Sequence, residues 1–72
     1  MKTITITTEF IKLQDLLKFA SLVSTGGEAK IVILEEEVRV NGEVCTQRGR
    51  KIRPGDVVEF NGESFTVNYA DQ

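Results

Sequence analysis

Residues 38–60 read VRVNGEVCTQRGRKIRPGDVVEF and combine alternating apolar residues, two turn signals and a dense run of positive charge. The segment VRV at 38–40 alternates apolar and charged side chains, which is typical of a strand with one buried face. The dipeptide Asn41-Gly42 tolerates the positive φ angles of a two-residue hairpin turn. Pro54-Gly55-Asp56 predicts a second turn, because proline presets φ at its first corner. This part of the chain is therefore expected to form short strands joined by tight turns.

Positive charge is concentrated in the same stretch, in the run Arg48, Arg50, Lys51 and Arg53. Residues 38–55 carry five positive side chains and one negative, a local charge of +4, whereas the rest of the chain carries four positive and ten negative, a local charge of −6. The chain is thus electrically two-sided although its net charge is −2. A positive face of this kind steers a polyanion towards the molecule. The competing interpretation is a set of surface cations that only keep the loop soluble.

The residues upstream of this stretch predict one strand and two helices. Residues 3–7 alternate threonine and isoleucine, which predicts an edge strand with Ile4 and Ile6 facing the core. A first helix is predicted from Lys12 to Ala20, because apolar residues recur there at helical spacing: Leu13, Leu16, Leu17 and Ala20. Thr25-Gly26-Gly27-Glu28 matches a capping box, which predicts the start of a second helix. The following residues, AKIVIL, would by propensity alone suit a strand, so the cap decides the assignment.

A further strand, turn and strand unit is predicted after the basic run, from Asp56 to Tyr69 around Asn61-Gly62. Its core candidates are Val58, Phe60, Phe65 and Val67. The predicted order is one strand, two helices and four short strands. This order indicates an α+β fold with two helices packed on one face of a small, mainly antiparallel sheet with Asn-Gly hairpins. Seventy-two residues allow a single domain, residues 1–72, with one small core.

The composition excludes most catalytic and metal sites. The chain has no histidine and one cysteine, Cys45, which excludes imidazole bases, an intramolecular disulfide and the usual zinc ligand sets. Glu35, Glu36 and Glu37 are consecutive, and adjacent helical carboxylates point in different directions. We therefore expect no enzymatic activity, no metal, no cofactor and no small-molecule substrate. Because no apolar run approaches the roughly 20 residues of a membrane span and no signal region follows Met1, we expect a cytoplasmic protein without membrane contact.

Two other features bear on binding. Gly26-Gly27 at the start of the second helix would admit an anion at the helix N-terminus, with Lys30 one turn inside, or would be simply a flexible helix start. The aromatic residues are expected mostly in the core: Phe10, Phe19, Phe60, Phe65 and Tyr69. Few rings are then left to stack on bases, which favours recognition of a nucleic-acid backbone and shape.

These motifs together resemble the S-four RNA-binding domain family, named after small-subunit ribosomal protein four. The resemblance covers about residues 10–60, and its most specific pieces are VRVNG at 38–42 and RPGDVV at 53–58, which follow the Leu-rich segment LQDLLKFASLV. The helix start GGEAK at 26–30 resembles the stand-alone subgroup of YaaA/YbcJ type. The resemblance implies an αL motif, in which two helices and a β-ribbon form one RNA-binding surface, and it implies no catalytic activity.

By position, the resemblance implies RNA contacts from seven basic residues, with Gly26 and Gly27 admitting close backbone approach: Lys12, Lys30, Arg39, Arg48, Arg50, Lys51 and Arg53. Glu36 stands where many family members have glycine, which implies either a left-handed helix cap at a cost on the order of 1 kcal/mol or a different turn. The leading hypothesis is a non-enzymatic protein that binds structured RNA. Ribosomal RNA during subunit assembly is the target that the resemblance implies.

Two alternatives come from other functional classes. In the first, the acidic residues, including Glu35, Glu36 and Glu37, dock a basic partner such as a ribosomal protein. In the second, suggested by size, acidity and β content, the chain is a β-grasp sulfur carrier. Such carriers end in Gly-Gly, whereas this chain ends Ala70-Asp71-Gln72, so the sulfur-carrier hypothesis is disfavoured.

Overall fold

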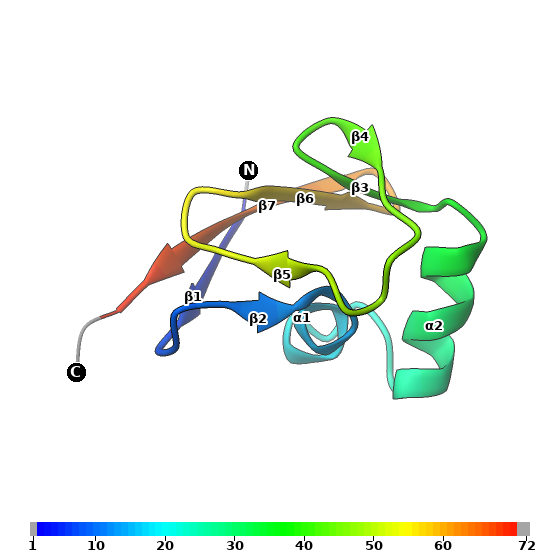
Figure 1. Cartoon of the computed structure of the whole chain (residues 1–72), viewed down its shortest axis with the longest axis horizontal. Coiled ribbons are helices and arrows are strands. Elements are labelled where there is room, and N and C mark those ends of the chain that lie inside the picture. Colours follow the sequence, from blue (N-terminus) through cyan, green and yellow to red (C-terminus); the bar gives the residue numbers. More distant parts are fainter. Residues whose placement is uncertain (1, 71–72) are drawn as a thin grey trace.

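A computed structural model describes residues 2–70 of the chain (Figure 1). The elements follow one another as β1 (Lys2–Ile6), β2 (Ile11–Lys12), α1 (Leu13–Phe19), α2 (Gly26–Leu34), β3 (Val38–Val40), β4 (Glu43–Val44), β5 (Lys51–Ile52), β6 (Val57–Phe60) and β7 (Glu63–Tyr69). Met1, Asp71 and Gln72 lie outside the described residues, and with them the chain end that disfavours the sulfur-carrier hypothesis.

Five strands form one sheet in the order β1-β7-β6-β3-β4, and β2 pairs with β5 in a separate two-stranded ribbon. β1 runs parallel to β7, whereas the other neighbours in the sheet are antiparallel. The predicted α+β class with a mainly antiparallel sheet is therefore confirmed, as is the edge position of the first strand. Five strands follow the helices within residues 2–70, one more than predicted. The two-residue strands β2 and β5 were missed because two residues cannot display an alternating pattern.

Both Asn-Gly dipeptides form the predicted hairpin turns. The φ angles are 52° and 86° at Asn41 and Gly42, and 54° and 79° at Asn61 and Gly62, which is the pattern of type I′ turns. The first turn is also held by side chains, because Asn41 Nδ2 donates to Asp56 Oδ1 at 3.1 Å and Asn41 Oδ1 accepts from the Val57 N–H at 2.9 Å. The β3–β4 turn and the turn before β6 are therefore tied together.

The cap of the second helix decides its structure, as predicted. Thr25 Oγ1 accepts a hydrogen bond from the Glu28 N–H at 3.1 Å. The Glu28 carboxylate accepts from the Ser24 N–H at 2.7 Å, one residue before the partner of the standard capping box. These bonds satisfy donors at both sides of the helix start, so the β-branched residues that follow adopt a helix.

The other end of α2 closes with a left-handed residue, Glu36, whose φ is 63°. The Glu36 N–H donates to the Ile33 carbonyl at 3.2 Å and the Glu37 N–H donates to the Val32 carbonyl at 3.1 Å, which is the Schellman pattern of helix ends. Of the two possibilities for Glu36, the structure has the left-handed cap.

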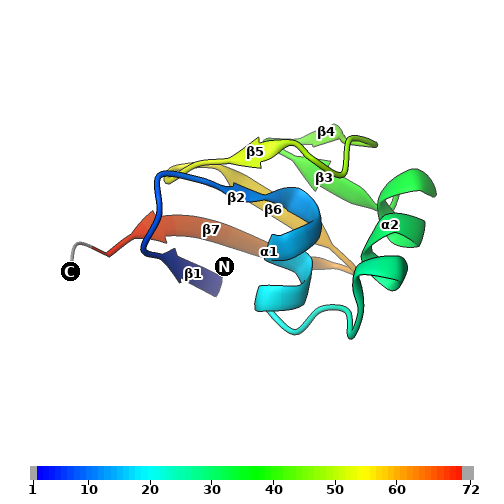
Figure 2. The ribbon, with the colours of Figure 1, turned by 60° about the horizontal axis from the view of Figure 1, so that its bottom comes forward.

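The core lies between one face of the sheet and a layer formed by α1, α2 and the β2–β5 ribbon (Figure 2). Both helices and β5 supply fully buried side chains, in addition to those of the sheet: Leu13, Leu16, Leu17, Ala29, Ile33 and Ile52. Within residues 2–70 no helix or strand covers the opposite face of the sheet. No helix of the described part is long and apolar enough to cross a membrane.

The aromatic residues are less buried than predicted. Phe65 is buried and Phe60 packs half-buried against the core, but Phe19 and Tyr69 are 59% and 51% exposed. Phe10 is half-buried without packing against the core. The aliphatic side chains fill the small core, so the expectation that most rings belong to it is wrong.

Candidate nucleic-acid interface

The β2–β5 ribbon places two positive side chains directly opposite each other. In its antiparallel register Ile11 faces Ile52 and Lys12 faces Lys51. Ile52 is fully buried and Ile11 packs against the core, so the ribbon is anchored by its isoleucines and its lysines remain exposed. Like charges that face each other across a strand pair are destabilising. The ribbon therefore holds an arrangement that an anion between the lysines would stabilise.

The segment before β5 brings two arginines to the same place. The N–H groups of Leu13 and Gln14, the first residues of α1, donate to the carbonyls of Arg50 at 2.9 Å and Arg48 at 3.1 Å. The N-cap residue Lys12 makes no side-chain capping bond, so the backbone of the basic segment caps the helix in its place. These bonds fix Arg48 and Arg50 beside Lys12.

Arg53 joins this group from the other end of β5. Its N–H donates to Asp56 Oδ2 at 2.9 Å and its carbonyl accepts from the Asp56 N–H at 3.0 Å, which closes the turn before β6. The guanidinium carbon lies 6.0 Å from the centre of the Phe10 ring, and Lys51 Nζ lies 4.9 Å from the same centre. We call the exposed set Lys12, Arg48, Arg50, Lys51 and Arg53 the basic ribbon.

Within residues 2–70, no carboxylate forms an ion pair with the basic ribbon. Among residues 2–70 one ion pair forms within 4.0 Å, between Lys2 Nζ and Glu63 Oε1 at 2.9 Å on the β1–β7 side of the sheet. The Asp56 carboxylate, adjacent in sequence to the ribbon, is occupied by the Asn41 amide and a backbone N–H. Five exposed positive residues with no carboxylate partner in the described part of the chain thus lie on adjoining segments, an arrangement suited to a polyanion.

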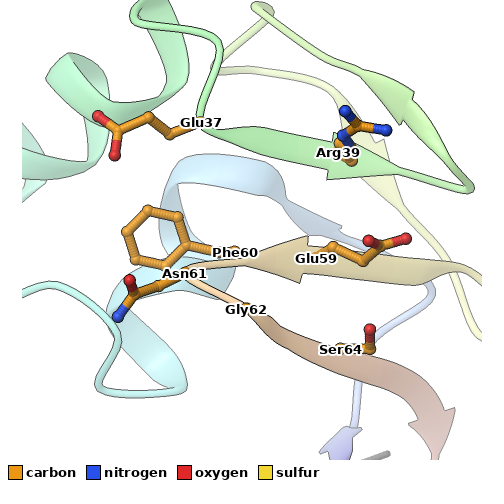
Figure 3. Close-up of a pocket in the computed structure, with 7 residues that line it drawn as sticks. All are labelled: Glu37, Arg39, Glu59, Phe60, Asn61, Gly62 and Ser64. Atoms are coloured by element: carbon orange, nitrogen blue, oxygen red, sulfur yellow. The ribbon is translucent and has the colours of Figure 1, made fainter.

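Arg39, in contrast, lies on the opposite face of the sheet. Its neighbours Val38 and Val40 are buried while Arg39 is exposed, and its partner across the strand pair is Glu59. Figure 3 shows Arg39 and Glu59 at a shallow pocket of about 180 Å³ on that bare face, which is lined by Glu37, Arg39, Glu59, Phe60, Asn61, Gly62 and Ser64. Arg39 therefore shares its surface with carboxylates and is not brought together with the basic ribbon.

The predicted glycines of α2 also lie apart from the basic ribbon. Gly26 and Gly27 begin the helix beside the end of α1, whereas the ribbon lies at the start of α1 (Figures 1 and 2). A Cβ atom at Gly26 would meet nothing within 4 Å, and one at Gly27 would meet only Thr25 Oγ1 at 3.8 Å. Neither glycine is required for space. Lys30 is exposed on the same helix, next to the buried Ala29.

Phe10 is the residue of this surface that sequence reasoning missed. The signal that could have found it is its position two residues before Lys12, because alternate residues of an extended chain point to the same side. This position was overlooked because the Phe10 ring was assigned to the core.

Comparison with known proteins shows relatives of this chain. The model of the S4 domain family matches residues 4–68. The probable ribosome maturation protein RlbA of Bacillus subtilis (strain 168) is 49% identical over 65 residues, which cover 89% of this chain and 92% of RlbA. The putative RNA-binding protein YbcJ of Escherichia coli (strain K12) is 42% identical over 57 residues, which cover 79% of this chain and 81% of YbcJ.

Solved structures show the same fold. The solution structure of YbcJ from Escherichia coli, described as having an αL motif involved in RNA binding, superposes with a TM-score of 0.71 at 38% identity, over 94% of this chain and 87% of YbcJ. The 30S ribosomal protein S4e from Thermoplasma acidophilum superposes with a TM-score of 0.68 at 27% identity, over 92% of this chain and 35% of that protein. The family model, the relatives and the shared fold confirm the resemblance seen in the sequence, and the chain belongs to the S4 domain family.

Proposed function

We propose that this protein binds structured RNA through the basic ribbon and has no catalytic activity. The observation that carries the proposal is the gathering of five exposed cations on one two-stranded ribbon and its capping segment, none of them paired with a carboxylate of residues 2–70. Arginine binds phosphate through two parallel hydrogen bonds, and lysine adds a mobile point charge. The αL motif described in YbcJ as involved in RNA binding supports the same assignment.

The RNA partner we propose is ribosomal RNA during ribosome maturation in the cytoplasm. The support for this choice is the name of the Bacillus subtilis relative, a probable ribosome maturation protein. The phosphate contacts are placed on the basic ribbon. Lys30, Arg39 and the glycines of α2 stay predicted contacts from the family resemblance, and they extend the surface only if the RNA reaches beyond the ribbon.

A salt titration with a structured RNA tests the proposal. If four to six phosphates are engaged, the slope of log K against log salt concentration is roughly −3 to −5. The double variant R50A/K51A should weaken binding at least tenfold and reduce the slope by roughly 2, because each removed cation releases about one phosphate contact. Circular dichroism checks that the variant stays folded.

The matched control is K2A/K18A, which removes the same charge from two exposed lysines outside the basic ribbon. We expect its salt slope to equal that of the original protein. A flat titration, or an equal loss of affinity in both double variants, would contradict binding through the ribbon.

A further inference from the structure

Phe10 is an aromatic residue held at the surface of the basic ribbon. Extending the antiparallel register of Ile11 with Ile52 places Phe10 opposite Arg53. The isoleucines point into the core, so the residues on either side of them point outward: Phe10, Lys12, Lys51 and Arg53. The distances agree, with Lys51 Nζ at 4.9 Å and the Arg53 guanidinium carbon at 6.0 Å from the ring centre.

The ring contributes little to the core, since it is absent from the buried cluster and from the half-buried residues that pack against it. Its backbone is fixed by the loop after β1, where Thr8 Oγ1 donates to the Phe10 carbonyl at 2.7 Å. Two long cationic side chains lie over the ring, those of Lys51 and Arg53. A cation over an exposed ring changes an equilibrium by only about two- to fivefold, so both cations can leave the ring for stronger partners.

We infer that Phe10 stacks on an unpaired base of the bound RNA while Lys51 and Arg53 bind the phosphates beside that base. This inference rests on the proposed RNA binding and makes it more specific. When the two cations turn to phosphate, the face of the ring that they covered is free, and a base replaces them. One base stacked on an aromatic side chain changes affinity by roughly 5- to 150-fold, compared with roughly 4- to 25-fold for the two cation–ring contacts together. The hydrogen bonds that both cations gain with phosphate add to the difference.

The ligand class follows from this geometry. Bases inside a duplex are stacked on one another and cannot reach a side chain, whereas bases of loops, bulges and ends can. The favoured RNA therefore has an unpaired nucleotide next to a phosphate backbone, and an uninterrupted duplex lacks the stacking contact.

The test uses four RNAs that share one stem sequence. Three present a single unpaired 2-aminopurine, in the loop of a hairpin, in a one-nucleotide bulge or at a free end, and the fourth is an uninterrupted blunt-ended duplex in which the 2-aminopurine is paired. We expect the protein to quench the fluorescence of at least one unpaired probe and to bind that RNA at least fivefold more tightly than the paired one. The variant F10L should lose the quenching and the preference, and F10Y should restore both, because the tyrosine ring stacks and leucine does not.

Phe19, which is exposed at the end of α1, supplies the control variant F19L, and we expect it to keep the preference. Equal binding of all four RNAs with a steep salt slope would overturn the inference while the proposed function stands. If F10L weakens binding to paired and unpaired probes equally, the inference is also overturned. That result would mean that Phe10 only positions the cations and does not stack on a base. Binding to none of the RNAs would contradict both proposals.

Discussion

At the scale of single residues, Glu36 carries a backbone conformation that favours glycine. Its φ of 63° lies in the left-handed region, and its carboxylate lies at the negative end of α2. We expect E36G to raise the free energy of unfolding by about 0.5–1 kcal/mol, because glycine adopts this φ without strain. Urea denaturation measures the change.

The variant E36Q separates the two effects at this position. It removes the charge and keeps the strained φ, so it should gain only a few tenths of a kcal/mol. An equal gain in E36Q and E36G would assign the cost to charge and contradict the backbone explanation.

Gly26 and Gly27 contrast with Glu36, because the fold does not require glycine at either position. Both positions have space for a Cβ atom, and alanine is the better helix former. G26A and G27A should each raise the free energy of unfolding by about 0.5 kcal/mol. If the backbone here approaches RNA, as the family resemblance implies, the added methyl groups should also weaken binding. Unchanged RNA affinity in the stabilised variants would mean that both glycines only begin the helix and do not contact RNA.

Single residues also show which features could be predicted from the sequence and which could not. The turn residues at 41–42 and 61–62 were predictable because type I′ turns need positive φ at both positions. Phe10 was assigned wrongly, because composition does not show which rings a small core can hold. The separation of Arg39 from the basic ribbon was also hidden, since neighbours in a sequence pattern can lie on opposite faces of a sheet.

At the scale of elements, α1 depends on the segment that carries the arginines. The helix starts at Lys12 without a side-chain cap, and the carbonyls of Arg48 and Arg50 accept its first N–H groups. K12S supplies a capping hydroxyl and removes the repulsion from Lys51. We expect it to raise the free energy of unfolding by about 0.5–1 kcal/mol and to weaken RNA binding. Thermal or urea unfolding with an RNA titration measures both.

K18S is the matched control, because Lys18 lies in the last turn of the same helix and outside the basic ribbon. Serine is a weaker helix former than lysine and lacks the positive charge that is favourable at a helix C-terminus, so K18S should lose a few tenths of a kcal/mol while RNA affinity stays the same. If K12S binds RNA as tightly as the original protein, Lys12 does not contribute to the proposed RNA contact.

Elements were predictable where their signal was local. α2 was recognised from its cap despite a strand-like interior, because the bonds of Thr25 and Glu28 lie within a few residues of each other. The β2–β5 ribbon was not, since its two-residue strands lie about forty positions apart in the sequence. The basic residues were therefore identified in advance, whereas the element that gathers them was not.

At the scale of the whole molecule, the uneven charge distribution of the sequence corresponds to two surfaces of different charge. The basic ribbon lies on the helical side of the sheet, and Arg39 lies on the bare side with Glu37 and Glu59 (Figure 3). We expect R39A to change RNA affinity less than twofold, because an RNA on the ribbon does not reach the other face. A loss as large as that of R50A/K51A would mean that the RNA wraps around the sheet edge.

The acidic residues at the end of α2 test the remaining alternative of a protein partner. Glu35 and Glu37 are exposed and form no ion pair among residues 2–70. The charge reversal E35K/E37K should leave RNA bound at least as tightly as before, since it adds positive charge. If the acidic residues dock a basic protein such as a ribosomal protein, the same variant should lose capture of that protein. If it abolished RNA binding instead, these carboxylates would belong to the RNA surface.

The most direct measurement of the central claim is an amide chemical-shift titration of the whole chain with a structured RNA. Binding through the basic ribbon predicts that the largest shifts fall on residues 10–14 and 48–53, while Arg39, Glu59 and Ser64 on the bare sheet face stay close to their free positions. Shifts concentrated on the bare face, with residues 48–53 unchanged, would contradict the account.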